Sequence, residues 1–382
     1  MQHSIKMKQT SEHLSAFVSS GNLEQFLSFE PTDMPKWREK NLSPQTVSSI
    51  PTTSDMIREI AGYQRTYDKL KKSNNNNFKR QEVQKKLLTQ LLCVTQTAEG
   101  IGVQNEGKTK QIMQRADTET QYSYGSSQNF SKAETETMNL CRAHYHIIRE
   151  TQPDTGIDFF AECGGLLETD SLILRTHEIL MEDVMKEHQI PGRFSTKQRE
   201  TEFRGKKKYY PAFEQERFAH KAIETLVDKT NDIFDQIKNK LVSEEEKLKL
   251  FFKCTSLFMY CFLTIHPFPD GNGRLARLLA SYHLTTISPF DTPIFNVFGV
   301  SGEDDFIRAL ADTSENFLSS KRMITTEDEA VKLAISVLHH KPSDLCAMVI
   351  ESNWAMWRQL LFALGDDNIT PFEWDNQQFF ST

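Results

Sequence analysis

A long apolar segment, residues 248–265, runs directly into a short loop rich in proline and glycine. Ser243 followed by Glu246 is a capping-box pattern, which predicts that a helix begins just before this segment. Pro267 and Pro269 predict that the same helix ends at the loop, because proline cannot continue a helix. Two lysines interrupt the apolar segment, so we interpret it as a core helix of a globular protein and not as a membrane span.

Helical spacing of apolar residues recurs along most of the chain. The ranges that show it are 81–97, the stretch from 133, 166–184, 213–237 and 275–284. Only residues 194–210 show a different residue pattern, in which Thr, Phe and Tyr alternate with charged residues around Gly205. This pattern predicts a β-hairpin. We therefore expect a mostly α fold, a helical core with one small β-hairpin.

Breaks in the helical pattern divide the chain into ranges of different character. Four consecutive asparagines, residues 74–77, predict a linker, and residues 104–132 are polar and rich in Gln, Thr and Ser. The ranges we expect are 1–73 as an N-terminal region that is either helical or partly mobile, 81–103 as a helix, 104–132 as a polar linker, 133–298 as the central core and 299–382 as a C-terminal helical region.

Composition narrows the cellular compartment and the classes of partner that we expect. The 382 residues carry a formal net charge of −7, which counts against a dedicated nucleic-acid binder. Six cysteines are scattered without a C-x-x-C pair, and the N-terminal residues lack the apolar core of a signal peptide. We therefore expect a cytoplasmic or nuclear protein, without a transmembrane segment and without nucleic acid or membrane as a partner.

The loop at residues 266–277 reads HPFPDGNGRLAR and joins two predicted helices. Gly271 and Gly273 let the backbone adopt conformations closed to other residues and let a ligand approach the main chain. Backbone amides that open onto a helix N-terminus form an anion site. Arg274 and Arg277 lie three residues apart on the first turns of the second helix, so both can face that site, and arginine suits phosphate oxygens. The loop therefore predicts a phosphate site.

Two further residues of the loop have side chains suited to binding a metal ion or removing a proton. Asp270 is a suitable ligand for Mg2+, which takes one or two carboxylates together with phosphate oxygens. His266 can remove a proton near neutral pH. Either residue alone would more often be structural, but their combination with a phosphate site within twelve residues indicates transfer of a phosphorus-containing group onto a hydroxyl.

The same loop resembles the Fic family signature, His-x-Phe-x-Asp/Glu-Gly-Asn-Gly-Arg-x-x-Arg, at every fixed position. The wider resemblance covers about residues 165–290 and includes residues 174–180 and the turn at 191–194, whereas Ser195 stands where the family often has another Arg. It implies a Fic-type helical core whose hairpin is a flap that aligns a target segment by strand addition. It also implies a protein adenylyltransferase that transfers AMP from ATP to a Ser, Thr or Tyr hydroxyl.

The resemblance assigns roles residue by residue. His266 would be the catalytic base, and Asp270 would bind the Mg2+ that bridges the α- and β-phosphates. The remaining positions would bind ATP: Gly271, Asn272 and Gly273 at the α-phosphate, and Arg274 and Arg277 at the β- and γ-phosphates. Phe268 would anchor the loop in the core.

A second motif lies upstream, where residues 95–100 fit Ser/Thr-x-x-x-Glu-Gly/Asn, the inhibitory motif of this family. The implied mechanism is electrostatic: Glu99 pairs with Arg277 and takes the group that should bind the γ-phosphate. Residues 81–103 would then be an inhibitory helix. In some relatives the same glutamate helps to remove AMP, so the resemblance also allows the reverse reaction.

Two alternatives stay open. The loop could transfer a different nucleotide or another phosphate-containing group, or the chain could be a non-catalytic interaction scaffold with a nucleotide pocket. The intact His266 and the unaltered Gly-Asn-Gly core favour AMP transfer. Family members often form dimers, which makes a homodimer an expectation from the resemblance, and the sequence does not name the target protein.

Overall fold

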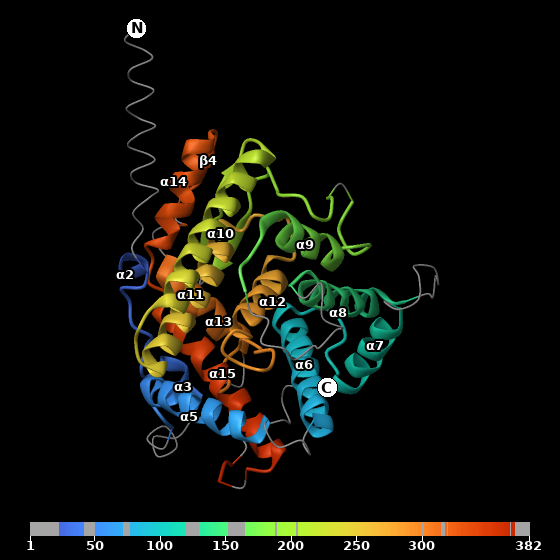
Figure 1. Ribbon diagram of the computed structural model, residues 1–382. Coiled ribbons are helices and arrows are strands. Elements are labelled where there is room, and N and C mark those ends of the chain that lie inside the picture. Colours follow the sequence, from blue (N-terminus) through green and yellow to red (C-terminus); the bar gives the residue numbers. More distant parts are fainter. Residues whose placement is uncertain are drawn as a thin grey trace.

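The computed structural model describes residues 23–41, 50–71, 77–119, 130–151, 165–187, 189–203, 205–298, 302–314, 318, 320–366 and 368–370. Within these ranges the chain is mostly helical, with two small sheets (Figure 1). The mostly α fold predicted from helical periodicity is therefore confirmed.

The N-terminal part is built from helices. They are α2 (Leu23–Phe26), α3 (Lys36–Asn41), α5 (Thr53–Lys71), α6 (Asn77–Glu99), α7 (Glu106–Glu119) and α8 (Lys132–Thr151). Residues 104–132 were expected to be a polar linker, and for residues 106–119 this is wrong. α7 buries Ile112, Met113 and Ala116 against the core, and this apolar face is too narrow to stand out in a polar sequence.

The central part contains the hairpin and the long helices. Its elements are the π-helix η2 (Thr169–Leu174), α9 (Arg175–Leu180), β1 (Glu200–Phe203), β2 (Lys206–Tyr209), β3 (Ala212–Phe213), α10 (Glu216–Asn239), α11 (Glu244–Ile265) and α12 (Asn272–Leu284). The predicted start of α11 is confirmed, because Ser243 is its N-cap and the Ser243 side chain accepts a hydrogen bond from the Glu246 amide.

The predicted β-hairpin is also confirmed. β1 and β2 pair antiparallel, with Glu200 opposite Tyr209 and Phe203 opposite Lys206. A second pairing was not expected: β3 runs parallel to β4 (Met323–Ile324), so that residue 213 meets residue 324. Nothing local in the sequence signals a contact between segments so far apart in the chain.

The C-terminal part closes the core. It consists of α13 (Gly302–Ser314), β4, α14 (Glu327–Leu338) and α15 (Ser343–Leu364). One cluster of buried apolar side chains extends from Leu23 to Leu364, so the described N-terminal, central and C-terminal parts share a core. The division of the chain into separate ranges stays a prediction.

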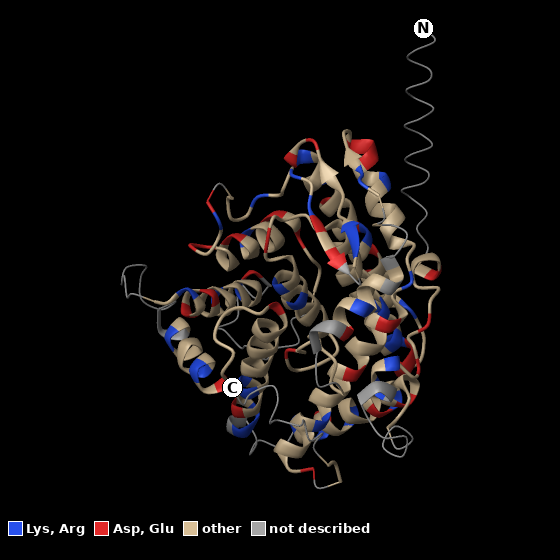
Figure 2. Cartoon of the chain, turned by 180° about the vertical axis from the view of Figure 1, so that it is seen from behind, with Lys and Arg blue, Asp and Glu red and all other residues tan. Residues whose placement is uncertain are grey.

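α11 lies at the centre of this core. It packs against α5, α10, α12, α14 and α15. By length and composition α11 could cross a membrane, but 94% of its apolar window is buried inside the fold, as is typical of the core helix of a globular protein. On the outside, basic and acidic residues are interspersed over the helices, without a broad face of one sign in this view (Figure 2).

Candidate functional site

α11 ends where the motif loop begins. His266 caps α11 in the left-handed conformation, with φ 52°, and its amide still donates to the Phe262 carbonyl at 2.9 Å. Pro267 has no amide hydrogen and stops the helix. The loop therefore leaves the buried end of α11 at a sharp angle and carries the His266 side chain with it.

Gly271 starts the next helix. Its φ is 78°, and a Cβ at this position would lie 2.7 Å from Met181 Sδ, so only glycine fits both the backbone and the space. α12 follows directly, with its first helical hydrogen bond from the Leu275 amide to the Gly271 carbonyl. The amides of the intervening residues lie at a helix N-terminus, where the backbone favours an anion.

The loop is braced by side chains from within. Asn272 accepts from the Phe268 amide at 3.0 Å and donates to the Phe268 carbonyl at 2.8 Å. Phe268 is fully buried and stacks on the His177 ring, with 3.7 Å between centroids. The expectation that Phe268 anchors the loop is confirmed. The Asn272 side chain is engaged in the loop itself, which leaves only its backbone amide for an anion.

His177 on α9 holds the outer side of the loop. Its Nδ1 accepts from the Gly192 amide at 2.9 Å, and its Nε2 donates to the Asp270 carbonyl at 3.0 Å. Burial lowers the pKa of His177 to about 4, with the Asp270 carbonyl working in the opposite direction. The ring is therefore neutral at pH 7, and its two hydrogen bonds join the 191–192 turn to the loop.

An acidic side chain already occupies the anion site at the α12 N-terminus. A Cβ built on Gly273 would lie 2.2 Å from Glu99 Oε1, so the carboxylate lies directly over this glycine. Arg277 Nη1 donates to the same oxygen. The Arg277 side chain is 2% exposed and that of Glu99 28%, which makes this a largely buried ion pair. The predicted pairing of Glu99 with Arg277 is thus present.

The two motif arginines retain donors for further oxygens. Arg274 is 4% exposed, and within the described part of the chain its Nε and Nη1 are buried without a hydrogen-bond partner. The same is true of Arg277 Nε. Buried guanidinium N–H groups without acceptors are costly in a finished core, and they suit an anion with several oxygens, such as a phosphate chain.

Asp270 is the exposed member of the site. Its side chain is 58% exposed and lies 3.5 Å from Arg274 Nη2. Its Oδ1 also accepts from the Gly271 amide at 2.6 Å. Among the described residues, no group of three or more His, Cys, Asp or Glu side chains could hold a metal ion. A single carboxylate beside a phosphate site is the donor set that Mg2+ uses when phosphate oxygens supply other ligands.

The His266 ring faces the base of the hairpin. It stacks on Tyr210 with 3.9 Å between ring centroids and 14° between planes. Burial lowers the pKa of His266 to about 3; the charge of Arg199 adds to this shift, and the Leu263 carbonyl opposes it. The imidazole is therefore neutral at pH 7 and able to accept a proton. Negative phosphates nearby would raise its pKa toward a value better suited to a base.

The end of α6 fixes Glu99 in place. Gly100 is left-handed, with φ 61°, and donates to the Thr97 carbonyl, while the Ile101 amide donates to the Gln96 carbonyl. These two bonds form a Schellman motif, which ends the helix directly after Glu99. The loop that follows is tied to α8, because the Gly102 amide donates to Glu136 at 2.9 Å. Figure 1 shows α6 beside α7 and α8, with its end toward α12.

The structure thus brings together every predicted site residue, from Glu99 to the loop and the start of α12. Three residues that touch the loop were not singled out from the sequence: His177, Arg199 and Tyr210. Their contacts span long sequence separations, and only the resemblance over residues 174–180 pointed near one of them. On the second strand of the hairpin, Lys206 and Lys207 are exposed whereas Lys208 is buried.

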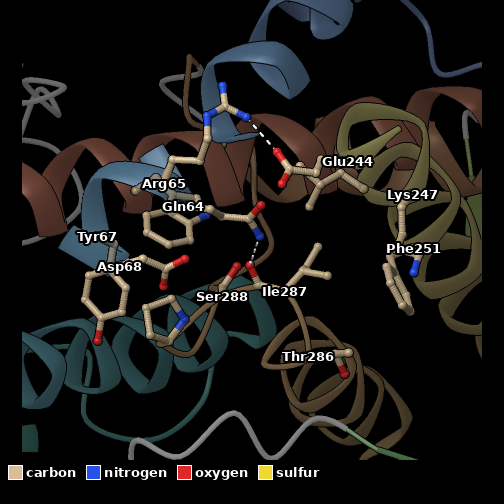
Figure 3. A pocket seen from close by; sticks show the side chains of 13 residues that line it. Gln64, Arg65, Tyr67, Asp68, Glu244, Lys247, Phe251, Thr286, Ile287 and Ser288 are labelled. Carbon is tan, nitrogen blue, oxygen red and sulfur yellow. Dashed lines mark hydrogen bonds and ion pairs between the residues drawn. The ribbon is translucent and has the colours of Figure 1, made fainter. Parts of the chain in front are cut away.

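A separate cavity lies away from the motif. It measures about 280 Å³ and is lined by residues of α5, the start of α11, the 286–289 segment and Trp357. Arg65 and Glu244 form an ion pair of 2.6 Å across it, and Gln64 donates to the Ile287 carbonyl at 2.7 Å (Figure 3). None of its lining residues belongs to the 266–277 loop.

Comparison with known proteins gives one family match. The Fic/DOC family model matches residues 168–284. The solved structures that resemble the chain include a Fic domain containing signaling protein from Bacteroides thetaiotaomicron (17% identical, 80% of this chain and 97% of that chain, TM-score 0.48). They also include Fic-1 (residues 134–508) from C. elegans (16% identical, 84% and 74%, TM-score 0.47).

One curated protein shares a shorter segment. It is the ribonucleoside-diphosphate reductase small chain of Ostreid herpesvirus 1 (isolate France), 33% identical over 130 residues. The match covers 34% of this chain and 21% of that protein, so the chain spans about a fifth of its length.

Fic-domain proteins are generally transferases that act on nucleotides. The family match covers α9 to α12, which includes the hairpin, the motif loop and both motif arginines. Over residues 168–284, this chain carries a domain of the Fic/DOC family.

Proposed function

We propose that this protein is an adenylyltransferase that transfers AMP from ATP to a Ser, Thr or Tyr hydroxyl of a protein, and that Glu99 holds it in an inhibited state. The observation that carries the proposal is the place of the Glu99 carboxylate. It lies over Gly273 and accepts from Arg277, at the helix N-terminus where the motif would bind phosphate.

The ATP phosphates would take over the contacts that Glu99 now makes. The amides at the start of α12 and the Arg277 guanidinium would bind phosphate oxygens, and the free N–H groups of Arg274 would bind further ones. Mg2+ would be held by Asp270 and would neutralise part of the phosphate charge. These groups suit a triphosphate better than they suit one small anion, because two arginines with free donors converge there.

His266 supplies the base in this proposal. The neutral imidazole takes the proton of the target hydroxyl while the hydroxyl oxygen attacks the α-phosphorus. The bond between the α-phosphorus and the bridging oxygen breaks, and pyrophosphate leaves. The Glu99–Arg277 pair would oppose this reaction by denying the triphosphate its binding group.

Five described cysteines are free and buried, which supports a reducing compartment, cytoplasmic or nuclear, for this activity.

Mass spectrometry of the protein itself tests the proposal. The Glu99→Gly protein is incubated with Mg2+ and each nucleoside triphosphate in turn, and its intact mass and modified residues are recorded. We expect an adduct that matches AMP with ATP, less in wild type, and none in the Glu99→Gly/His266→Ala protein. An adduct that matches another nucleotide would establish a different donor, and no adduct with any donor would favour the scaffold.

A further inference from the structure

One segment at the base of the hairpin binds three consecutive carbonyls of the motif loop. The Ser195 amide donates to the Pro267 carbonyl at 2.8 Å. Arg199 Nη1 donates to the Phe268 carbonyl at 2.9 Å and also to the His266 carbonyl. The backbone of the residue that carries the imidazole is therefore bonded directly to the segment that leads into the hairpin.

Arg199 joins more than these two partners. Its Nη2 donates to the Pro211 carbonyl at 2.9 Å, on the other leg of the hairpin. Within the described part of the chain no carboxylate pairs with this guanidinium, and burial lowers the pKa of Arg199 to about 10. A partly buried charge bonded only to carbonyls is costly. The planar fork of arginine, which reaches several acceptors at once, accounts for its use here.

Tyr210 restrains the imidazole ring itself. Its ring lies nearly parallel to the His266 ring, and its own amide donates to the Arg199 carbonyl at 3.1 Å. The Gln198 side chain donates to the Tyr210 carbonyl at 2.6 Å. The stacking residue and the arginine thus belong to one hydrogen-bonded unit at the hairpin base.

We propose that Arg199 and Tyr210 are positioning residues, which fix the His266 imidazole to the base of the hairpin. This inference rests on the proposed function, in which His266 deprotonates the target hydroxyl, together with the flap role that the family resemblance implies for the hairpin. These two residues form a clamp, which keeps the distance and orientation between the base and the target constant when the hairpin moves. Misplacement of a reacting group by about 1 Å can cost about 100-fold in rate.

Two effects of Arg199 must be separated, because it both holds the loop and lowers the pKa of His266. The other titratable groups of the site are Tyr210 on the hairpin, Glu99 on α6, and Asp270, Arg274 and Arg277 on the loop and α12. Arg199→Lys keeps the positive charge but loses the fork, whereas Arg199→Met loses both. Arg193→Met is the matched control, since the Arg193 side chain is 64% exposed and its ion pair with Glu216 spans 3.6 Å.

The kinetic test uses these variants in the full-length Glu99→Gly protein. We expect both Arg199 variants to lower kcat by about 10- to 100-fold, with the KM for ATP changed by less than about 3-fold, because no phosphate contact is removed. The Arg193 variant should keep the parental kcat. Tyr210→Leu should be about 10-fold slower than Tyr210→Phe, which keeps the ring. Only Arg199→Met should move the acidic limb of the pH–rate profile to higher pH, because it alone removes the positive charge that lowers the pKa of His266.

A parental kcat in Arg199→Met would overturn the proposal. An equal fall of kcat, ATP affinity and melting temperature would also overturn it, because that pattern is a loss of structure and not of position.

Hydrogen exchange gives a readout that needs no activity. In the wild-type protein and in Arg199→Met, exchange is followed at the Phe268 and Gly271 amides and in the hairpin. We expect faster exchange in both regions of the variant, with α10 unchanged. If the loop amides exchange at the wild-type rate, the clamp does not exist. If the loop loosens but no variant transfers a nucleotide, the clamp stands and the proposed function fails.

Discussion

The Glu99 carboxylate and the ATP phosphates compete for one anion site, so removal of the carboxylate should tighten nucleotide binding. Arg277, the partner, is 2% exposed, whereas Glu99 is 28% exposed, so solvent screens part of the pair. A hydrogen bond to a charged group contributes about 1.5–3 kcal/mol, and partial exposure favours the lower end. Since about 1.4 kcal/mol is a tenfold change in affinity, we expect Glu99→Gly to bind ATP about 10- to 30-fold more tightly.

The assay is isothermal titration with Mg2+ and an ATP analogue that resists cleavage. Glu99→Gln keeps the shape and removes the charge, so it should tighten binding nearly as much as Glu99→Gly if the effect is electrostatic. Glu82→Gln, an exposed position on the same helix, is the control and should bind like wild type. The reasoning is refuted if Glu99→Gly and Glu99→Gln bind the analogue no more tightly than wild type.

Three further predictions concern the loop and the buried histidines. Asp270→Ala in the Glu99→Gly protein should abolish Mg2+-dependent transfer while the melting temperature changes little, because the side chain is 58% exposed; equal losses of both would make Asp270 structural. Gly273→Ala in the same protein should abolish ATP binding in the titration, since its Cβ would enter the anion site that Glu99 fills in wild type; unchanged affinity would place the phosphates elsewhere. Burial lowers the pKa of His266 and His283 to about 3, whereas a histidine in the unfolded chain has a pKa of about 6.5. Between these two pH values the unfolded chain binds more protons than the folded chain, so stability should fall as the pH falls through this window. The melting temperature should drop less on acidification in His283→Phe than in wild type, and an equal drop would contradict the lowered pKa of His283.

The sequence predicts the motif loop well because its information is local. The helix before it, the proline stop and the two glycines are neighbours in the chain, and each acts through its own backbone preference. Glu99 was placed opposite Arg277 only through a family resemblance, since nothing in the spacing of the two residues shows that α6 ends beside α12.

The failures have a common physical cause, which is packing between distant segments. α7 was expected to be linker because its buried side is narrow and the rest of the helix is polar. Arg199 looks like any surface arginine in the sequence, yet it is partly buried and bonded to carbonyls that lie 12 to 69 residues away. The side-chain role of Asn272 in bracing Phe268 is also visible only once the loop is folded.

Transfer of label from ATP tests the central claim most directly. The Glu99→Gly protein is incubated with Mg2+ and ATP labelled on either the α- or the γ-phosphate, with the Glu99→Gly/His266→Ala protein as the blank. We predict that protein-bound label appears from the α-phosphate only, and only when His266 is present. Label from the γ-phosphate, or equal α-label without His266, would contradict AMP transfer by this site.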